Sequence, residues 1–190
     1  MCARLVKLLL LSTIVLASGA SFADEYADTV KVFRGAGQSA TFFGKSYGYA
    51  VFPTIGKGGI GVGAAHGSGR VYAKGKYVGD TSMTQLSVGL QLGGEAYSEI
   101  IFFQDKRSFD EFTGGNFEFG AQAQAVAITA GASAQATTTG ASTSASTSSS
   151  HAKTQAPGYQ KGMAVFTVAK GGLMYEASVS GQKFSYKPKK

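Results

Sequence analysis

The sequence predicts an α+β protein, a single domain with a mostly antiparallel β-sheet, an N-terminal amphipathic helix and a short mid-chain helix. Three observations favour this class. Apolar residues recur at helical spacing early in the chain, and they alternate with polar residues through much of the remainder. Turn-forming glycines separate the alternating segments. A chain of 190 residues suits one domain of this kind.

The first 23 residues have the pattern of a secretory signal peptide. Arg4 and Lys7 precede an uncharged apolar run, and Ser21-Phe22-Ala23 places small residues where a signal peptidase reads them. A retained membrane anchor is the alternative, but the apolar run is shorter than the roughly 20 residues that a spanning helix needs. We expect cleavage before Asp24 and a periplasmic or secreted domain of residues 24–190.

Composition narrows the partners of that exported domain. The one cysteine, Cys2, would leave with the leader, so we expect no disulfide. Removal of Arg4 and Lys7 leaves 16 of the 18 basic residues against 11 acidic ones, a net charge of +5. This modest excess favours anionic surfaces such as phospholipid head groups. Nucleic acid is not expected as a partner outside the cytoplasm.

The N-terminal helix is expected from residue 24 to about residue 47. Gly35-Ala36-Gly37 should interrupt it, since glycine costs about 1 kcal/mol relative to alanine inside a helix. A second short turn is expected from Ser39 to Gly44. One face carries an apolar stripe at i, i+4 and i+7, with two basic residues beside it. The stripe is Tyr26, Val30 and Phe33, and the basic residues are Lys31 and Arg34.

Strands are expected from residue 49 onward. A short apolar run, 49–53, ends at a proline, which donates no ladder hydrogen bond. Residues 69–78 resemble a hairpin that turns near Lys74-Gly75-Lys76. Ile100–Phe103 is wholly apolar and predicts a central strand. The strictest alternation predicts a half-buried strand whose apolar face is Thr84, Leu86, Val88, Leu90 and Leu92.

The mid-chain helix is expected where Ser108 and Glu111 have capping-box spacing, and Gly114 should stop it. Alanines alternate from residue 121 to 136 and change phase once at Ile128-Thr129. Alanine propensity alone favours a helix there, but the period of two favours a long strand with a bulge.

The chain from Thr137 to about Gln155 is almost entirely Ser, Thr, Ala and Gly, and we interpret it as a flexible loop. Strands are then expected at 163–169, 173–179 and 183–186, with a turn at Ser180-Gly181.

The glycines of residues 49–76 raise the question of a nucleotide site. Gly56, Gly58 and Gly61 match a dinucleotide fingerprint, and Asp80 follows at the right distance. That fingerprint requires a helix to start at the glycines, and here a hairpin is expected instead. We therefore interpret the glycines as structural, allowing bends and close backbone approach. His66 and His151 lack further ligands at metal-binding spacing, so no enzyme activity, cofactor or metal is expected.

Four stretches together resemble the SYLF domain family, also called the Ysc84 or DUF500 family. They are GYAVFPTIGKGGIGVGAAHGSGRVY, LSVGLQLGGEAYSEIIFF, FEFGAQAQAVA and KGMAVFTVAKGGLMYEASVSGQKF. Two departures stand out. Where many members have tryptophan-serine-proline, this chain has Thr81-Ser82-Met83 and contains no tryptophan, and the Ser/Thr-rich loop resembles an insertion.

The resemblance implies a non-enzymatic module that binds phosphoinositide-like anionic membrane surfaces, partly through an N-terminal amphipathic helix. Some family members bind actin, which is not an expected partner for an exported protein. The residues expected to bind lipid are Tyr26, Val30, Lys31, Phe33, Arg34, Lys45 and Lys57. Two alternatives stay open: the helical stripe covers the domain's own core, or the protein is a structural or protein-interaction component of the periplasm.

Overall fold

The computed structural model describes residues 20–60, 62–88, 94–121, 123, 125–128, 158–170 and 179–190. Within them lie three helices and one eight-stranded sheet. The helices are α1 (Ala20–Gly35), α2 (Gly37–Ala40) and α3 (Lys106–Thr113). The strands are β1 (Gly48–Ile60), β2 (Val62–Ala73), β3 (Lys76–Val88), β4 (Gly94–Phe103), β5 (Asn116–Glu118), β6 (Val126–Ile128), β7 (Met163–Lys170) and β8 (Lys183–Pro188).

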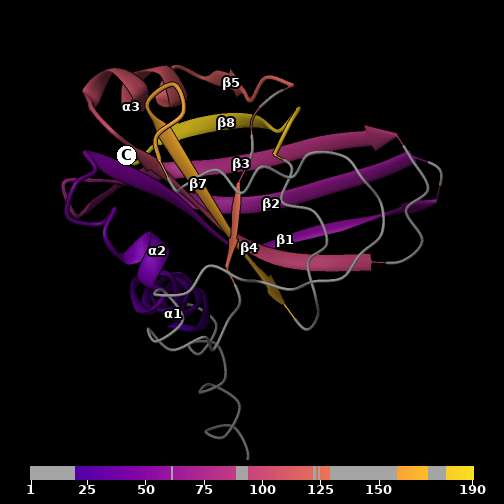
Figure 1. Cartoon of the computed structure of the whole chain (residues 1–190), viewed down its shortest axis with the longest axis horizontal. Helices are drawn as coiled ribbons and strands as arrows, with labels where there is room; N and C mark the ends of the chain where they lie inside the picture. Colours follow the sequence, from indigo (N-terminus) through magenta and orange to yellow (C-terminus); the bar gives the residue numbers. More distant parts are fainter. Residues whose placement is uncertain are drawn as a thin grey trace, which may run out of the picture.

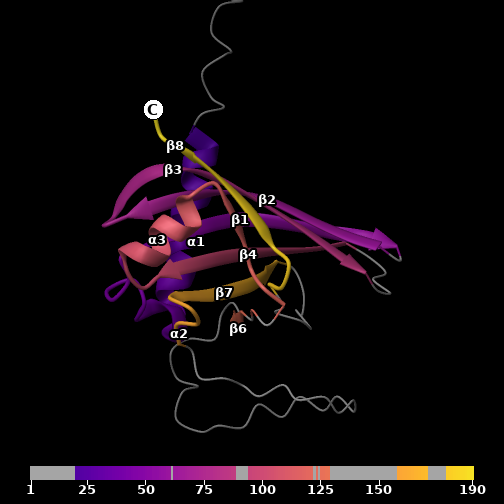
Figure 2. The ribbon, with the colours of Figure 1, turned by 90° about the horizontal axis from the view of Figure 1, so that it is seen from above.

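The sheet confirms the predicted class. Its strand order is β5-β8-β3-β2-β1-β4-β7-β6, and every neighbouring pair is antiparallel except β6 and β7. Figure 1 shows α1 and α3 on opposite sides of this strongly twisted sheet. Figure 2 shows that all three helices gather over one half of the sheet, while the long strands β1 to β4 extend well beyond them.

Each face of the sheet carries its own core. The α3-side core includes Phe52, Ile101, Phe112 and Phe184, which are all buried. The α1-side core includes Phe33, Val51, Phe102 and Phe166. Because neighbouring residues of a strand point to opposite faces, Val51 and Phe52 divide between the two cores, as do Ile101 and Phe102.

The predicted helical stripe packs on the α1-side core. Phe33 is fully buried, and Tyr26 and Val30 pack against the same cluster at partial burial. The helix breaks after Gly35 as predicted, and α2 follows. The Ser39 hydroxyl donates to the Phe33 carbonyl at 2.6 Å across the break, so the two helices are tied together.

The hairpin between β2 and β3 turns at Lys74 and Gly75, which confirms the predicted position. Both residues have positive φ, 50° and 78°. This is typical of a type I′ turn, whose twist matches that of antiparallel strands.

Pro53 does not end a strand, and that prediction was wrong. β1 continues through it because the pairing with β2 and β4 shifts between Val51 and Ile55, where the missing N–H of proline is tolerated. The Pro53 carbonyl accepts a hydrogen bond from the Ser98 hydroxyl at 2.7 Å.

The prediction for β3 was wrong about which side is buried. Thr81 and Met83 are buried, whereas the opposite face carries Thr84 and Leu86, both exposed. Leu86 is 78% exposed because it lies near the end of β3, where the long strands extend beyond α1 (Figure 2). Leu90 and Leu92 lie outside the described residues.

The capping box of α3 also differs from the prediction. Asp105, not Ser108, is the N-cap: its carboxylate accepts from the Ser108 N–H at 2.9 Å, and the Ser108 hydroxyl faces the Asp105 N–H. Glu111 instead pairs with Arg107. Gly114 ends the helix as predicted.

The alanine-rich segment forms a strand only at Val126–Ile128 within the described residues. Ala123 and Ala125 lie outside any strand and pack on the α3-side core, so a strand starting at 121 was a wrong prediction. The remainder of that segment, the predicted loop at 137–155 and most of the predicted strand at 173–179 lie outside the described residues. β7, β8 and the turn at Ser180-Gly181 confirm the remaining predictions.

Candidate functional site

Antiparallel pairing brings five separate chain segments to one end of the sheet. β1 begins beside the end of β4, at Gly48 and Phe103, and β7 begins there too, at Met163. The β2–β3 turn and the end of β8 lie at this same end. We call it the basic end because nine exposed cationic side chains lie there. They are Lys45, Lys74, Lys76, Lys106, Arg107, Lys161, Lys187, Lys189 and Lys190.

Local acids offset only part of this charge. Lys106 and Arg107 form ion pairs with Asp110 and Glu111 along α3. The other lysines of the basic end form no ion pair with any residue that the structure describes. Farther along the sheet the signs are mixed: Lys170 lies near Glu25, and Lys183 near Glu118. Positive charge is therefore concentrated at one end of the molecule.

Half-buried tyrosines accompany the cations. Tyr49 and Tyr72 stack at 5.0 Å between ring centres, and Tyr77 lies 6.0 Å beyond Tyr72. Lys189 Nζ lies 5.0 Å from the Tyr77 ring centre, and Lys74 Nζ lies 5.5 Å from that of Tyr47. Such side chains combine an apolar ring with a polar hydroxyl, which suits a boundary between water and an apolar phase.

Two of these tyrosines, Tyr77 and Tyr49, have raised pKa values. Burial and a hydrogen bond to Asp80, 2.7 Å from the hydroxyl, raise the pKa of Tyr77 to about 12. Burial, with Tyr72 as the next cause, also raises the pKa of Tyr49. Tyr49 and Tyr77 thus add no negative charge to the basic end.

The residues predicted to bind lipid do not all lie together. Arg34 Cζ lies 4.3 Å from the ring centre of Phe43, two residues before Lys45, so Arg34 borders the basic end to which Lys45 belongs. Lys31 is exposed on α1 and forms an ion pair with Asp28. Lys57 pairs across the ladder with Ala65 of the α3-side core, so it lies on the sheet face opposite α1. Tyr26, Val30 and Phe33 contact the α1-side core in this conformation.

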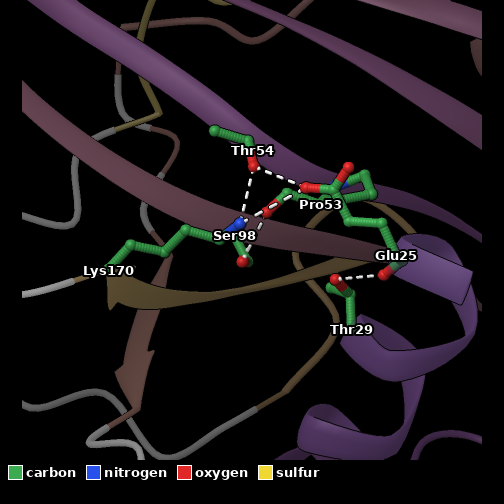
Figure 3. Close-up of polar contacts among 6 residues, drawn as sticks. All are labelled: Glu25, Thr29, Pro53, Thr54, Ser98 and Lys170. Carbon is green, nitrogen blue, oxygen red and sulfur yellow. Dashed lines mark hydrogen bonds and ion pairs between the residues drawn. The ribbon is translucent and has the colours of Figure 1, made fainter. Parts of the chain in front are cut away.

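A polar group, the helix clasp (Glu25, Thr54 and Lys170), fastens the N-terminal part of α1 to the sheet. Thr54 donates to Glu25 at 2.9 Å and accepts from Lys170 Nζ at 2.6 Å (Figure 3). The three residues come from α1, β1 and β7, which are distant in sequence. Because Glu25 and Lys170 are each more than 40% exposed, solvent weakens their attraction, and the clasp orients the helix more than it stabilises it.

Sites for other chemistry do not form among the described residues. Gly56 and Gly58 lie inside β1, and β2 starts at Val62, so no helix N-terminus follows them to hold a pyrophosphate. Within the described ranges, no three His, Cys, Asp or Glu side chains are grouped to bind a metal. None of the helices described has the length and apolarity needed to cross a bilayer. His66 is exposed on β2.

Sequence reasoning missed most of the basic end. Lys74 and Lys76 were predicted to lie in a turn, but nothing local indicated that Lys161 and Lys189 would lie near them. A usable signal was present: lysines recur where predicted strands start or end, and antiparallel strands bring alternate connections to the same end of a sheet.

Comparison with known proteins identifies the family of this chain. The profile of the Ysc84 family, described as "Las17-binding protein actin regulator", matches residues 84–189. Beta cell expansion factor A of Aeromonas veronii is 30% identical over 162 residues, which is 83% of this chain and 53% of that protein. The chain thus spans about half the length of this relative. The profile match covers more than half of the chain, and the protein therefore belongs to the Ysc84, or SYLF domain, family.

Proposed function

We propose that this protein is a non-enzymatic module of the bacterial envelope that binds anionic phospholipid surfaces through its basic end. The observation that carries the proposal is the gathering of nine exposed cations, from five segments, at one end of the sheet. Family membership supports a binding role rather than catalysis. The family description mentions actin regulation, but we expect export of this chain, which would separate it from cytoplasmic actin.

The strength of binding follows from the charges. A lysine or arginine near an anionic leaflet contributes about 1 kcal/mol. The attraction decays over a Debye length of about 8 Å at physiological salt, so only side chains at the contacting end take part. Several lysines acting together would give firm but salt-sensitive binding. The tyrosines beside them suit the head-group region, where such rings are enriched in membrane proteins.

Placing the lipid contact at the basic end changes the role expected of α1 in membrane binding. Arg34 and Lys45 remain in the proposed contact, at its border. Phe33 has no exposed surface in the folded domain, so insertion of the apolar stripe into lipid would require α1 to leave the sheet. Lys57, on the opposite face, is left outside the proposed contact.

Flotation with vesicles tests the proposal. Wild-type protein should float with vesicles containing anionic phospholipid and not with purely zwitterionic ones. Replacing Lys74 and Lys76 with glutamine should weaken the partition constant roughly 30-fold, from about 1 kcal/mol per lysine. The matched control, Lys57→Gln with Lys183→Gln, removes two charges outside the basic end and should change it by less than about threefold.

Two outcomes would contradict the proposal. One is failure of the wild-type protein to float with either kind of vesicle. The other is an equal loss in the two double variants, which would mean that net charge, rather than the basic end, determines binding.

The second candidate function is a protein-interaction component of the envelope. It is favoured by a different feature, the exposed apolar side chains Val62 and Leu86 near the far end of the sheet, which are 62% and 78% exposed. Exposed apolar surface often marks a contact site. A test of this surface is given in the Discussion.

A further inference from the structure

A carboxyl group lies in the middle of the α3-side core. Glu99 is completely buried on β4, with Phe52 of β1 and Thr167 of β7 as its cross-strand neighbours. It forms no ion pair with any lysine or arginine that the structure describes. A buried carboxylate without a counter-charge is strongly disfavoured, so the protonated form is the one that fits this position.

The hydrogen bonds around Glu99 also favour its protonated form. Gln182 Nε2 donates to Glu99 Oε2 at 3.0 Å and lies 3.3 Å from the Tyr97 hydroxyl. Three buried oxygens have no partner among the described residues: Glu99 Oε1, Gln182 Oε1 and Thr167 Oγ1. An ionised Glu99 can only accept hydrogen bonds, so its Oε1 cannot satisfy Gln182 Oε1. A proton on Glu99 supplies a donor instead, and a carboxylic acid can then pair with the Gln182 amide through two hydrogen bonds.

Gln182 belongs to a turn, Val179–Gln182, that holds several elements together. The Gln182 carbonyl accepts from the Phe119 N–H at 3.0 Å, and the Gly181 N–H donates to the Phe119 carbonyl at 2.9 Å. Gln85 of β3 donates to the Ser180 carbonyl at 2.8 Å. Val179 is buried in the α3-side core. The turn is therefore the lid of this core, and Glu99 lies directly beneath it.

We propose that Glu99 is a proton-binding site that controls this lid: protonated Glu99 holds the Val179–Gln182 turn on the sheet, and loss of the proton loosens it. The expected direction of the pH response follows from burial, which raises the pKa of Glu99 to about 7 although the Gln182 hydrogen bond opposes the rise. The folded protein then keeps a proton that the unfolded chain loses near its ordinary pKa of 4.5. The contribution of Glu99 to the free energy of unfolding is therefore full below pH 4.5 and is lost as the pH rises through about 7.

The other titratable groups described around Glu99 are not expected to produce this pH dependence of stability. Tyr97, on the same strand, has its pKa raised by burial and then by Glu99, so it stays neutral. Glu95 lies farther along β4, exposed and opposite Lys57 of β1. The charged side chains of α3 pair in solvent, and Lys183 of β8 pairs with Glu118 on the opposite face. From β7 and the turn, the facing polar groups are the uncharged Thr167 and Gln182.

The test is thermal unfolding of the full-length protein from pH 4.5 to 8. The melting temperature of the wild type should fall by roughly 5–15 °C over this range, given the size of the shift and the length of the chain. Glu99→Gln, which cannot ionise, should lack this fall. The matched control, Glu95→Gln, removes an exposed carboxylate from the same strand and should behave like the wild type.

Two measurements keep the test decisive if Glu99→Gln folds poorly. Carbon-13 NMR of the wild type should show the Glu99 carboxyl titrating above pH 6, and the Phe119 and Gly181 amides should lose hydrogen-exchange protection between pH 5 and pH 8. A Glu99 carboxyl that titrates near 4.5, or a folded Glu99→Gln that keeps the wild-type pH response, would overturn the proposal.

Discussion

At the residue scale, the glycines of β1 and β2 fall into two classes that look alike in the sequence. A Cβ on Gly69 would lie 2.6 Å from the Phe52 ring and 2.9 Å from Thr81 Cγ2. One on Gly56 would meet nothing within 4 Å. Gly69 is thus required for close packing of the α3-side core, whereas at Gly56 there is room for a side chain. Spacing along the chain cannot separate the two classes, since what differs is the neighbour across the ladder.

Gly69→Ala should therefore lower the free energy of unfolding by about 1–3 kcal/mol, because the buried Phe52 ring has little room to move. Gly56→Ala is the matched control and should stay within about 0.5 kcal/mol of the wild type. Urea unfolding measures both. Equal effects at the two positions would show that the packing around Gly69 adjusts freely.

At the scale of elements, α1 is a core helix as it lies in the folded domain. Phe33 is fully buried between α1 and the sheet, while the neighbouring Val32 is 46% exposed. The period of the stripe correctly predicts which residues share a face. It does not decide whether that face meets protein or lipid, since both surfaces are apolar.

Phe33→Ala should cost about 3–5 kcal/mol of unfolding free energy, as expected for a large aromatic side chain removed from a core. Val32→Ala should change it by less than about 0.5 kcal/mol. Chemical denaturation without lipid distinguishes the two roles of the stripe. If Phe33→Ala unfolds like the wild type but floats poorly with vesicles, the stripe acts on the membrane and not on the core.

Elements with strong local signals were predicted well. The helix break at Gly35, the Lys74-Gly75 turn and β7 all follow from residue type and spacing. The errors involve tertiary context. Asp105 caps α3 from outside the helical pattern, and the buried side of β3 depends on which half of the sheet the helices cover. The basic end was missed for the same reason, because strand register brings its segments together.

At the scale of the whole molecule, the long strands extend beyond all three helices (Figure 2). Val62 and Leu86 lie on the α1-side face of the sheet, outside both cores, and are 62% and 78% exposed. Ala64 lies opposite Leu86 in the β2–β3 register. An exposed apolar patch on a sheet face favours contact with another surface.

Leu86→Ser should leave the unfolding free energy within about 0.5 kcal/mol of the wild type, since the side chain is mostly exposed, and should reduce any self-association. Light scattering over a concentration series measures the latter. Val32→Ser, which removes an exposed apolar side chain from α1, is the matched control. A wild-type protein that is monomeric at every concentration would argue against self-pairing through this face.

If the protein binds a membrane through its basic end, as proposed, the direction of the strands determines its orientation there. Since the basic end lies at one end of β1, this thirteen-residue strand would then run roughly along the bilayer normal. Leu86 lies ten residues after Lys76 on β3, so at about 3.3 Å per residue it would lie about 33 Å above the head groups. The long strands would thus hold the exposed side chains Val62 and Leu86 away from the membrane, where a second surface could contact them.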